Sequence, residues 1–323
     1  MFVIGPFLAD SQISDAISGA QLRQRLRQWQ PPSDPSTNHN IAYSLQHVGT
    51  AEWFCDGNIF FEEWKMTGSL LWIHGKRALF LHIMAPVTDG PRLRSWLWKD
   101  RVMVSRSLIL ATLGNKIFPS SSAIIEKIAT LYRAGKALMA YFYFDFRNEE
   151  KRSRRNLLPS LLAQLSARSE PFCDIFHRLY MEHDDGLRQP SDSALTACLK
   201  KMLNLRNQGP VYLILDALDE CPKTSGVPSI RKQVLDLVKE LVDLRLPRLH
   251  ICVTSRPEVD IQHILGSVAS HSVSLHTESG QKNDITEYVK SVIRSNSFGE
   301  ITRWSDADKE LVIETLSERA DGM

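Results

Sequence analysis

A chain of 323 residues is long enough for one large domain with appendages or for two modest domains. Its composition, with 43% hydrophobic and 24% charged residues, is that of a soluble globular protein and excludes collagen, coiled-coil and fully disordered classes. The formal net charge of only +2 gives no reason to expect binding to nucleic acid or to an anionic membrane.

The N-terminal region predicts one helix followed by a linker. Leu22, Leu26 and Trp29 recur at helical spacing, so residues 1–30 are expected to form a helical segment. The prolines that follow interrupt helix and strand alike, so residues 31–40 read as a linker within a connecting region that runs to residue 66. The first ten residues do not resemble a signal peptide, and the five cysteines form no Cys-x-x-Cys pair, so a reducing cytoplasmic location is expected.

From residue 67 the chain alternates short apolar runs with helical patterns. Runs that are apolar on both faces are typical of parallel strands covered by helices on each side. The fold class is therefore predicted to be α/β, with a parallel sheet over residues 67–280, and residues 281–323 are expected to begin a helical region that is truncated. The predicted strands are residues 69–74, 136–146, 211–216, 249–254 and 272–276, and the predicted helices are residues 121–132, 154–166, 193–205, 230–244, 283–295 and 305–320.

Two of the predicted strands end in residues that suit phosphate chemistry. Asp216 follows four apolar residues, at the sheet edge where α/β proteins bind ligands, and would hold Mg²⁺, while Asp219 or Glu220 would orient an attacking water. Arg256, after the next apolar run, could contact a γ-phosphate. The alternatives are that Asp216 only caps a turn and that Arg256 forms a local ion pair.

These residues, together with the Tyr-Phe-Tyr-Phe-Asp-Phe run that ends at residue 146, resemble the NACHT class of STAND P-loop ATPases, and specifically fungal proteins with a nephrocystin-like N-terminal domain. The resemblance implies a nucleotide-dependent switch that oligomerises, binds ATP or GTP with Mg²⁺ and contacts protein partners. It makes Asp216 the Walker B aspartate, Asp219 and Glu220 its acidic extension, and Arg256 a sensor arginine. Gly75 and Lys76 fall where the phosphate loop should begin.

The phosphate loop itself is missing. No GxxxxGK[ST] sequence occurs, and Lys76 is followed by Arg77 rather than by a hydroxyl residue. Residues 77–120 are an atypical insertion of net charge +5 that interleaves basic residues with tryptophans. The segment could be foreign sequence, such as a retained intron or a shifted gene model, or a real insertion with a diverged loop. A nucleic-acid or membrane-surface patch is the least favoured interpretation.

Two functions follow from this pattern. The first is a NACHT-type signalling NTPase module whose nucleotide binding is impaired in this chain. The second is a non-catalytic pseudo-NTPase scaffold or protein-interaction fragment that retains the α/β shell and needs no cofactor. The missing phosphate loop favours the scaffold, and the acids that end the strand at Asp216 favour the NTPase.

Overall fold

The computed structural model describes residues 9–45, 52–55, 59–75, 120–223 and 228–275, together with scattered positions between 283 and 314. The chain divides into two compact units. The first comprises Met1–Pro35 and Ile128–Ile251, and the second comprises Ser36–Lys127 and Cys252–Met323. Of the residues predicted to form the atypical insertion, 77–119 lie outside the described part of the chain.

Five strands form one sheet in the order β2-β3-β4-β1-β5. Strands β2 and β3 pair in parallel within the first unit, and β1 and β5 pair in parallel within the second. The predicted α/β class is confirmed. Strands β1, β3 and β4 coincide with apolar runs because nearly all of their side chains are buried, whereas in β5 only Val273 is buried. Their bounds are β1 Leu70–His74, β2 Leu138–Tyr143, β3 Val211–Asp216, β4 Leu249–Ser255 and β5 His271–Ser274.

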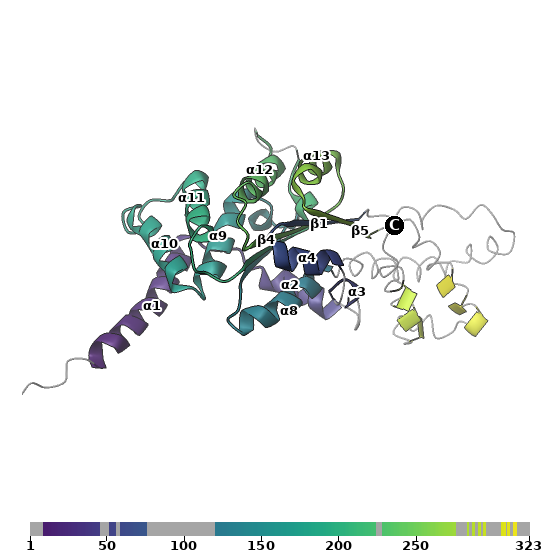
Figure 1. Cartoon of the computed structure of the whole chain (residues 1–323), viewed down its shortest axis with the longest axis horizontal. Coiled ribbons are helices and arrows are strands. Elements are labelled where there is room, and N and C mark those ends of the chain that lie inside the picture. The colour runs from purple at the N-terminus through teal and green to yellow at the C-terminus, as the bar shows by residue number, and fades with distance from the viewer. Residues whose placement is uncertain are drawn as a thin grey trace, which may run out of the picture. The chain divides into compact units, whose positions relative to one another are not determined.

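Helices α9, α10, α11 and α12 of the first unit begin at serine caps. The hydroxyls of Ser153, Ser169, Ser191 and Ser229 each accept a hydrogen bond from the backbone N–H three residues further on, which satisfies a donor that the first turn of a helix leaves unpaired. The helices of this unit are α1 Ala9–Trp29, α9 Arg154–Ser166, α10 Glu170–Met181, α11 Asp192–Leu203 and α12 Ile230–Val242 (Figure 1). Helix α9 lies at their centre and packs against α10, α11 and β2.

The free edge of β2 is closed by a side chain of α9. The Gln164 amide nitrogen donates to the Tyr141 carbonyl oxygen at 2.8 Å, and the Gln164 amide oxygen accepts from the Tyr141 backbone N–H at 3.1 Å. Strand β2 is the last strand on its side of the sheet, so these groups of Tyr141 would otherwise face away from the ladder. One glutamine thus replaces a neighbouring strand at this position.

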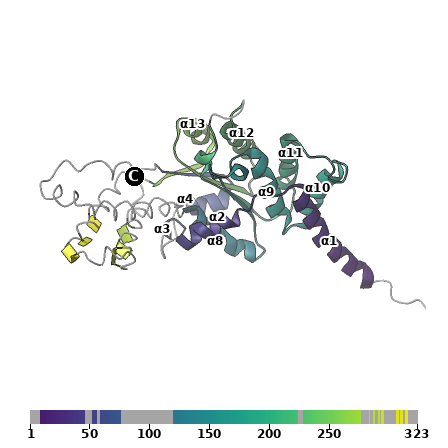
Figure 2. The same ribbon diagram turned by 180° about the vertical axis from the view of Figure 1, so that it is seen from behind.

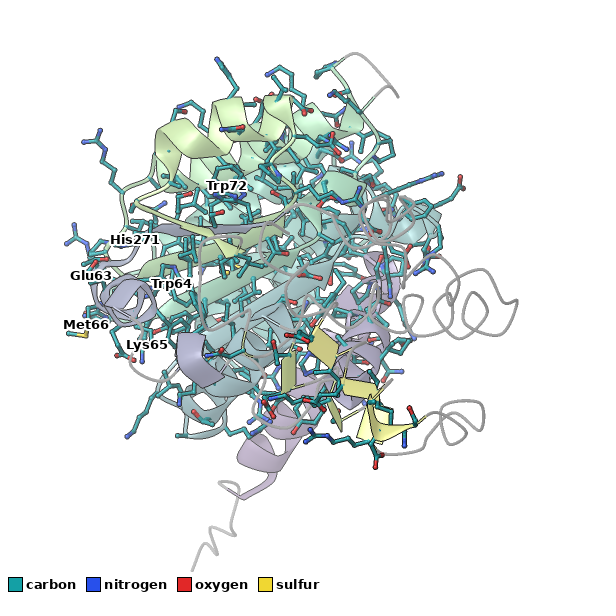
Figure 3. All side chains as sticks on the ribbon, turned by 90° about the vertical axis from the view of Figure 1, so that its right-hand side faces the viewer. Glu63, Trp64, Lys65, Met66, Trp72 and His271 are labelled. Carbon is teal, nitrogen blue, oxygen red and sulfur yellow. The ribbon has the colours of Figure 1, made fainter. Side chains whose placement is uncertain are left out.

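In the second unit, helices cover both faces of β1 and β5. Helix α13, Val259–Val268, lies on one face, and α2, Ser36–Leu45, and α4, Ile59–Thr67, lie on the other (Figures 1 and 2). The Trp72 indole N–H donates to the Ser255 hydroxyl at 2.9 Å, which ties β1 to β4 in the interior. The Oε2 atom of Glu63, on α4, lies 3.7 Å from Nδ1 of His271, on β5 (Figure 3). Met66, also on α4, points into solvent and is 82% exposed.

Helices α3 and α8 also belong to the first half of the chain. Helix α3, Glu52–Cys55, is a single turn, and α8, Ser120–Arg133, runs from the second unit into the first. Beyond β5, the described residues between 283 and 294 and between 306 and 314 are helical, in agreement with the two helices predicted there, whose full bounds lie outside the described residues. Within the described residues, no helix is both long and apolar enough to cross a membrane.

The predicted linker over residues 31–40 is partly wrong. Helix α2 begins at Ser36, directly after the third proline, because Pro35 ends the stretch that cannot form helix and a normal helical sequence follows. Helices α10 and α13 also lie where no element was predicted, although Phe172, Phe176 and Leu179 have the spacing of a buried helix face. The helices predicted at 121–132, 154–166, 193–205 and 230–244 are confirmed to within two residues at each end.

Candidate functional site

The candidate site is a turn rich in carboxylates that follows β3. We name residues 216–221 the acidic turn. Five buried side chains of β3 precede Asp216, whose own side chain is half-buried, so the strand places a carboxylate at the boundary between core and solvent. Ala217 then adopts the left-handed conformation, with φ of 56° and ψ of 46°, and the 3-10 helix η2, Leu218–Glu220, follows. The reversal keeps Asp219 and Glu220 close to the end of the strand.

An arginine of α12 forms hydrogen bonds with the backbone of the acidic turn. Arg231 is only 5% exposed. Its Nε donates to the Cys221 carbonyl oxygen at 3.0 Å, one of its terminal nitrogens donates to the Asp219 carbonyl oxygen, and its backbone N–H donates to the Pro222 carbonyl oxygen at 3.1 Å. Since a guanidinium has a rigid set of donors, these hydrogen bonds let Arg231 fix the backbone of the turn.

A second carboxylate reaches the same edge from β2. We name residues 145–151, which follow that strand, the Asp145 loop. The Asp145 carboxylate accepts from Nε and Nη2 of Arg147 at 3.0 and 3.2 Å and from the Arg147 backbone N–H at 2.9 Å. These hydrogen bonds hold the pKa of Asp145 below its usual value despite partial burial. The Asp145 carboxylate is therefore already paired with the Arg147 guanidinium and is poorly placed to bind a metal.

Glu220 is the carboxyl whose proton affinity is raised. Burial is the main cause of its raised pKa, and the negative charges of Asp219, Asp145 and Asp216 act in the same direction. The Glu220 Oε2 accepts from the Phe146 backbone N–H at 3.1 Å, which opposes the shift. A half-buried carboxyl with raised pKa, beside other acids at a strand end, has the properties of a general base or of a group that orients water.

Of the remaining predicted site residues, Gly75 and Arg256 lie in the second unit, and Lys76 lies outside the residues that the structure describes. Gly75 is buried and follows β1 directly, and Arg256 is half-buried and follows β4, which is the neighbour of β1 in the sheet. These two positions therefore end adjacent strands. Lys76 lies outside the described residues, and so does the segment that would supply a phosphate loop.

The acidic turn suits magnesium only in combination with a phosphate ligand. Among the described residues, no group of three or more histidine, cysteine, aspartate or glutamate side chains is arranged to hold a metal ion. Mg²⁺ in nucleotide sites, however, needs only one or two carboxylates and takes its other ligands from water and phosphate. The half-buried Asp216 fits that limited role. The nucleotide part of the site fits less well, because the sequence contains no GxxxxGK[ST] loop.

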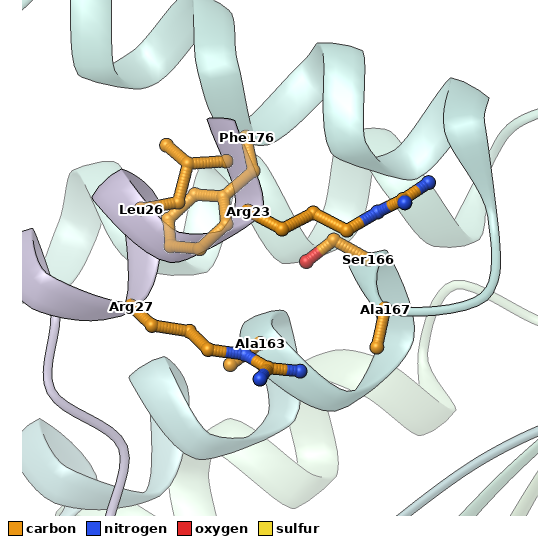
Figure 4. Close-up of a pocket in the computed structure, with 7 residues that line it drawn as sticks. All are labelled: Arg23, Leu26, Arg27, Ala163, Ser166, Ala167 and Phe176. Carbon is orange, nitrogen blue, oxygen red and sulfur yellow. The ribbon is translucent and has the colours of Figure 1, made fainter. Parts of the chain in front are cut away.

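A small pocket elsewhere in the first unit carries two arginines (Figure 4). It is lined by Arg23, Leu26, Arg27, Ala163, Ser166, Ala167 and Phe176. Its two arginines come from α1, and Ser166 and Ala167 form the C-terminal end of α9. Cations near the C-terminus of a helix complement its dipole, which gives the two arginines a favourable position.

Two residues of the site that no motif identifies, Asp145 and Arg231, still have recognisable signals in the sequence. Asp145 follows an apolar strand just as Asp216 does, so the rule that identifies Asp216 also identifies Asp145. Arg231 shares a helix face with Val234, Leu235 and Val238, all of which are buried. An arginine at a core position of an amphipathic helix indicates buried hydrogen-bond acceptors, which here are the carbonyl groups of the acidic turn.

Part of the chain matches a family of known proteins. Residues 119–256 match the family model described as nephrocystin 3, N-terminal, a range that contains the acidic turn and Arg256 but not Gly75 or Lys76. No curated protein matches the chain. A solved structure of Drosophila ORC bound to DNA is similar at 10% identity with a TM-score of 0.36, over 89% of this chain and 56% of that one, so the chain spans just over half of its length.

Proposed function

We propose that this chain is a nucleotide-responsive switch module of the NACHT type within the STAND P-loop NTPases, with ATP or GTP and Mg²⁺ as its ligands. The observation that carries the proposal is the acidic turn, in which Asp216 ends a buried strand and Glu220 keeps a raised pKa beside it. The similarity of residues 119–256 to the nephrocystin 3, N-terminal family supports the coarser assignment, an NTPase-like or interaction module. The module acts in the cytoplasm through conformational change and through protein partners or self-association, and it requires neither nucleic acid nor a membrane.

Each predicted site residue has a distinct task in this proposal. Asp216 would hold a hydrated Mg²⁺, and a bound Mg²⁺-nucleotide would supply the phosphate oxygens that complete the ion's shell. Glu220, with Asp219 beside it, would accept a proton from water at its carboxylate. Arg256 would contact the terminal phosphate, and Gly75 and Lys76 would approach the phosphates from the end of β1.

The affinity for nucleotide should be low. A normal phosphate loop provides a lysine and a row of backbone N–H groups, and a hydrogen bond to a charged group contributes about 1.5 to 3 kcal/mol. Each contact that is missing should therefore weaken binding by roughly tenfold to a hundredfold. The switch would then respond only to high nucleotide concentrations, with hydrolysis slow or absent.

The second candidate function is a pseudo-NTPase scaffold that binds protein partners without nucleotide. The absence of any GxxxxGK[ST] sequence favours it. The engagement of Asp145 by Arg147 favours it as well, because one carboxylate of the site already has an internal cation.

A titration with a fluorescent ATP analogue, with and without Mg²⁺, separates the two functions. The NTPase proposal expects weak binding that Mg²⁺ strengthens and that Asp216→Asn removes. Asp236→Asn is the matched control, since Asp236 is an acid on α12 whose side chain pairs with Lys232 at the surface. Binding that neither depends on Mg²⁺ nor changes in Asp216→Asn, or no binding at millimolar nucleotide, would reject the NTPase proposal in favour of the scaffold.

A further inference from the structure

The last residue of α1 and the segment that follows it are bound firmly to the rest of the first unit. We name residues 29–33 the strap. The Trp29 indole N–H donates to the Arg188 carbonyl oxygen at 3.0 Å. The Trp29 and Tyr180 rings pack edge to face, with 5.3 Å between their centroids. Gln30, only 2% exposed, donates from its side-chain amide to Gln189 at 2.6 Å. The first part of α1 extends away from α9 and α10, whereas the strap end lies against them (Figures 1 and 2).

The last residue of the strap joins it to the Asp145 loop. Ser33 is 6% exposed, and its hydroxyl donates to the carbonyl oxygen of Glu150. The Ser33 carbonyl oxygen accepts in turn from the hydroxyl of Ser160, on α9, at 3.2 Å. Pro31 and Pro32 precede Ser33 and restrict the backbone to extended conformations, so a displacement at Ser33 is not easily absorbed before Gln30.

The opposite end of the Asp145 loop is bound to the acidic turn. The Phe146 backbone N–H donates to the Glu220 carboxylate at 3.1 Å. Within the loop, the Asp145 backbone N–H donates to the Lys151 carbonyl oxygen at 2.9 Å and closes the loop at its base. One loop of seven residues therefore touches the acidic turn through Phe146 and the strap through Glu150.

We propose that the Asp145 loop is a coupling element that transmits the state of Glu220 to the strap and so to α1. When Glu220 accepts the Phe146 N–H, the loop is held and its Glu150 carbonyl remains in place for Ser33. When Glu220 turns to another partner, the loop loosens, Ser33 loses its acceptor, and the last turn of α1 becomes easier to open. The device needs no nucleotide, so it stands or falls separately from the proposed function.

Hydrogen–deuterium exchange of the whole chain tests this coupling without any ligand. Glu220→Ala removes the acceptor of the Phe146 N–H, so exchange should be about fivefold faster in peptides over residues 144–152, as expected for one lost hydrogen bond. A smaller increase, about twofold, should follow in peptides over residues 26–33, where the Gln30 N–H donates to the Leu26 carbonyl oxygen. Glu220→Gln keeps an acceptor oxygen and should exchange no faster than the wild type at either place.

The reverse experiment starts from the strap, because coupling between two places must act in both directions. Ser33→Ala should accelerate exchange over residues 144–152 as well as over 26–33. Ser267→Ala is the matched control, since its hydroxyl also donates to a backbone carbonyl oxygen, at Ile264, in the second unit. If Glu220→Ala accelerates exchange over the loop but leaves residues 26–33 unchanged, or if Ser33→Ala affects the strap alone, the loop does not couple the two places.

Discussion

The anchoring of the acidic turn by Arg231 leads to a prediction about stability. In Arg231→Met, the side chain keeps much of its apolar length but loses both hydrogen bonds to the carbonyl groups of Asp219 and Cys221. Each bond from a charged donor contributes about 1.5 to 3 kcal/mol, and the two carbonyl groups would remain partly buried. We expect a loss of about 3 to 5 kcal/mol in the free energy of unfolding, a large share of the total of about 5 to 15 kcal/mol usual for a domain.

Urea denaturation followed by circular dichroism measures this loss. The free energy of unfolding of Arg231→Lys should lie between those of the wild type and Arg231→Met, because an ammonium group can reach one of the carbonyl oxygens but not both. Arg178→Met, at an exposed position of α10, is the control and should change the free energy of unfolding by less than about 0.5 kcal/mol. A cost below about 1 kcal/mol for Arg231→Met would show that Arg231 does not hold the turn.

Three further predictions concern the acidic turn and the sheet. Glu220→Gln should raise the free energy of unfolding at neutral pH, because the raised pKa of Glu220 means that folding disfavours its ionised form. Thermal melts should show this gain in stability fading as the pH falls to about 4.5, and a gain that does not depend on pH would contradict the prediction. Gln164→Leu should cost about 1 to 3 kcal/mol in urea, since two bonds to Tyr141 are lost; an unchanged midpoint would mean that solvent replaces them. Replacing residues 77–120 with Pro-Gly-Ser-Gly-Lys-Ser-Val-Leu should restore Mg²⁺-dependent nucleotide binding. In that background Asp216→Ala should remove the Mg²⁺ dependence, whereas Glu220→Ala should only slow hydrolysis; nucleotide titrations in which Asp216→Ala has no effect would leave Asp216 a structural residue.

The strands could be predicted from the sequence because a parallel sheet buries both faces of each strand. The run at 211–216 is continuous and apolar, and strand β3 has the same limits. Helix α2 could not be predicted in the same way, because a cluster of prolines and polar residues dominates the local pattern. What decides its start is the position of Pro35 immediately before it, a local boundary that composition does not reveal.

The position of Asp216 at the end of its strand could be predicted from the sequence, but the contacts of the acidic turn could not. An acid after an apolar run identifies Asp216, since the rule depends only on the chain itself. The bond between Phe146 and Glu220 joins positions 74 residues apart, and the bonds from Arg231 end on backbone carbonyl groups, which no sequence pattern distinguishes. Such contacts depend on how a turn is positioned, and the left-handed conformation of Ala217 that positions this one is unusual for alanine.

The five cysteines are all buried thiols outside any disulfide, which makes the folded chain resistant to thiol reagents. Burial raises the pKa of Cys198 to about 12 and also raises the pKa of Cys221, so the reactive thiolate is scarce even where a reagent could enter. Cys173, Cys198 and Cys221 belong to the first unit, and Cys55 and Cys252 belong to the second. The rate at which each thiol is alkylated therefore reports how often its own unit opens, and Cys221 reports on the acidic turn without any added label.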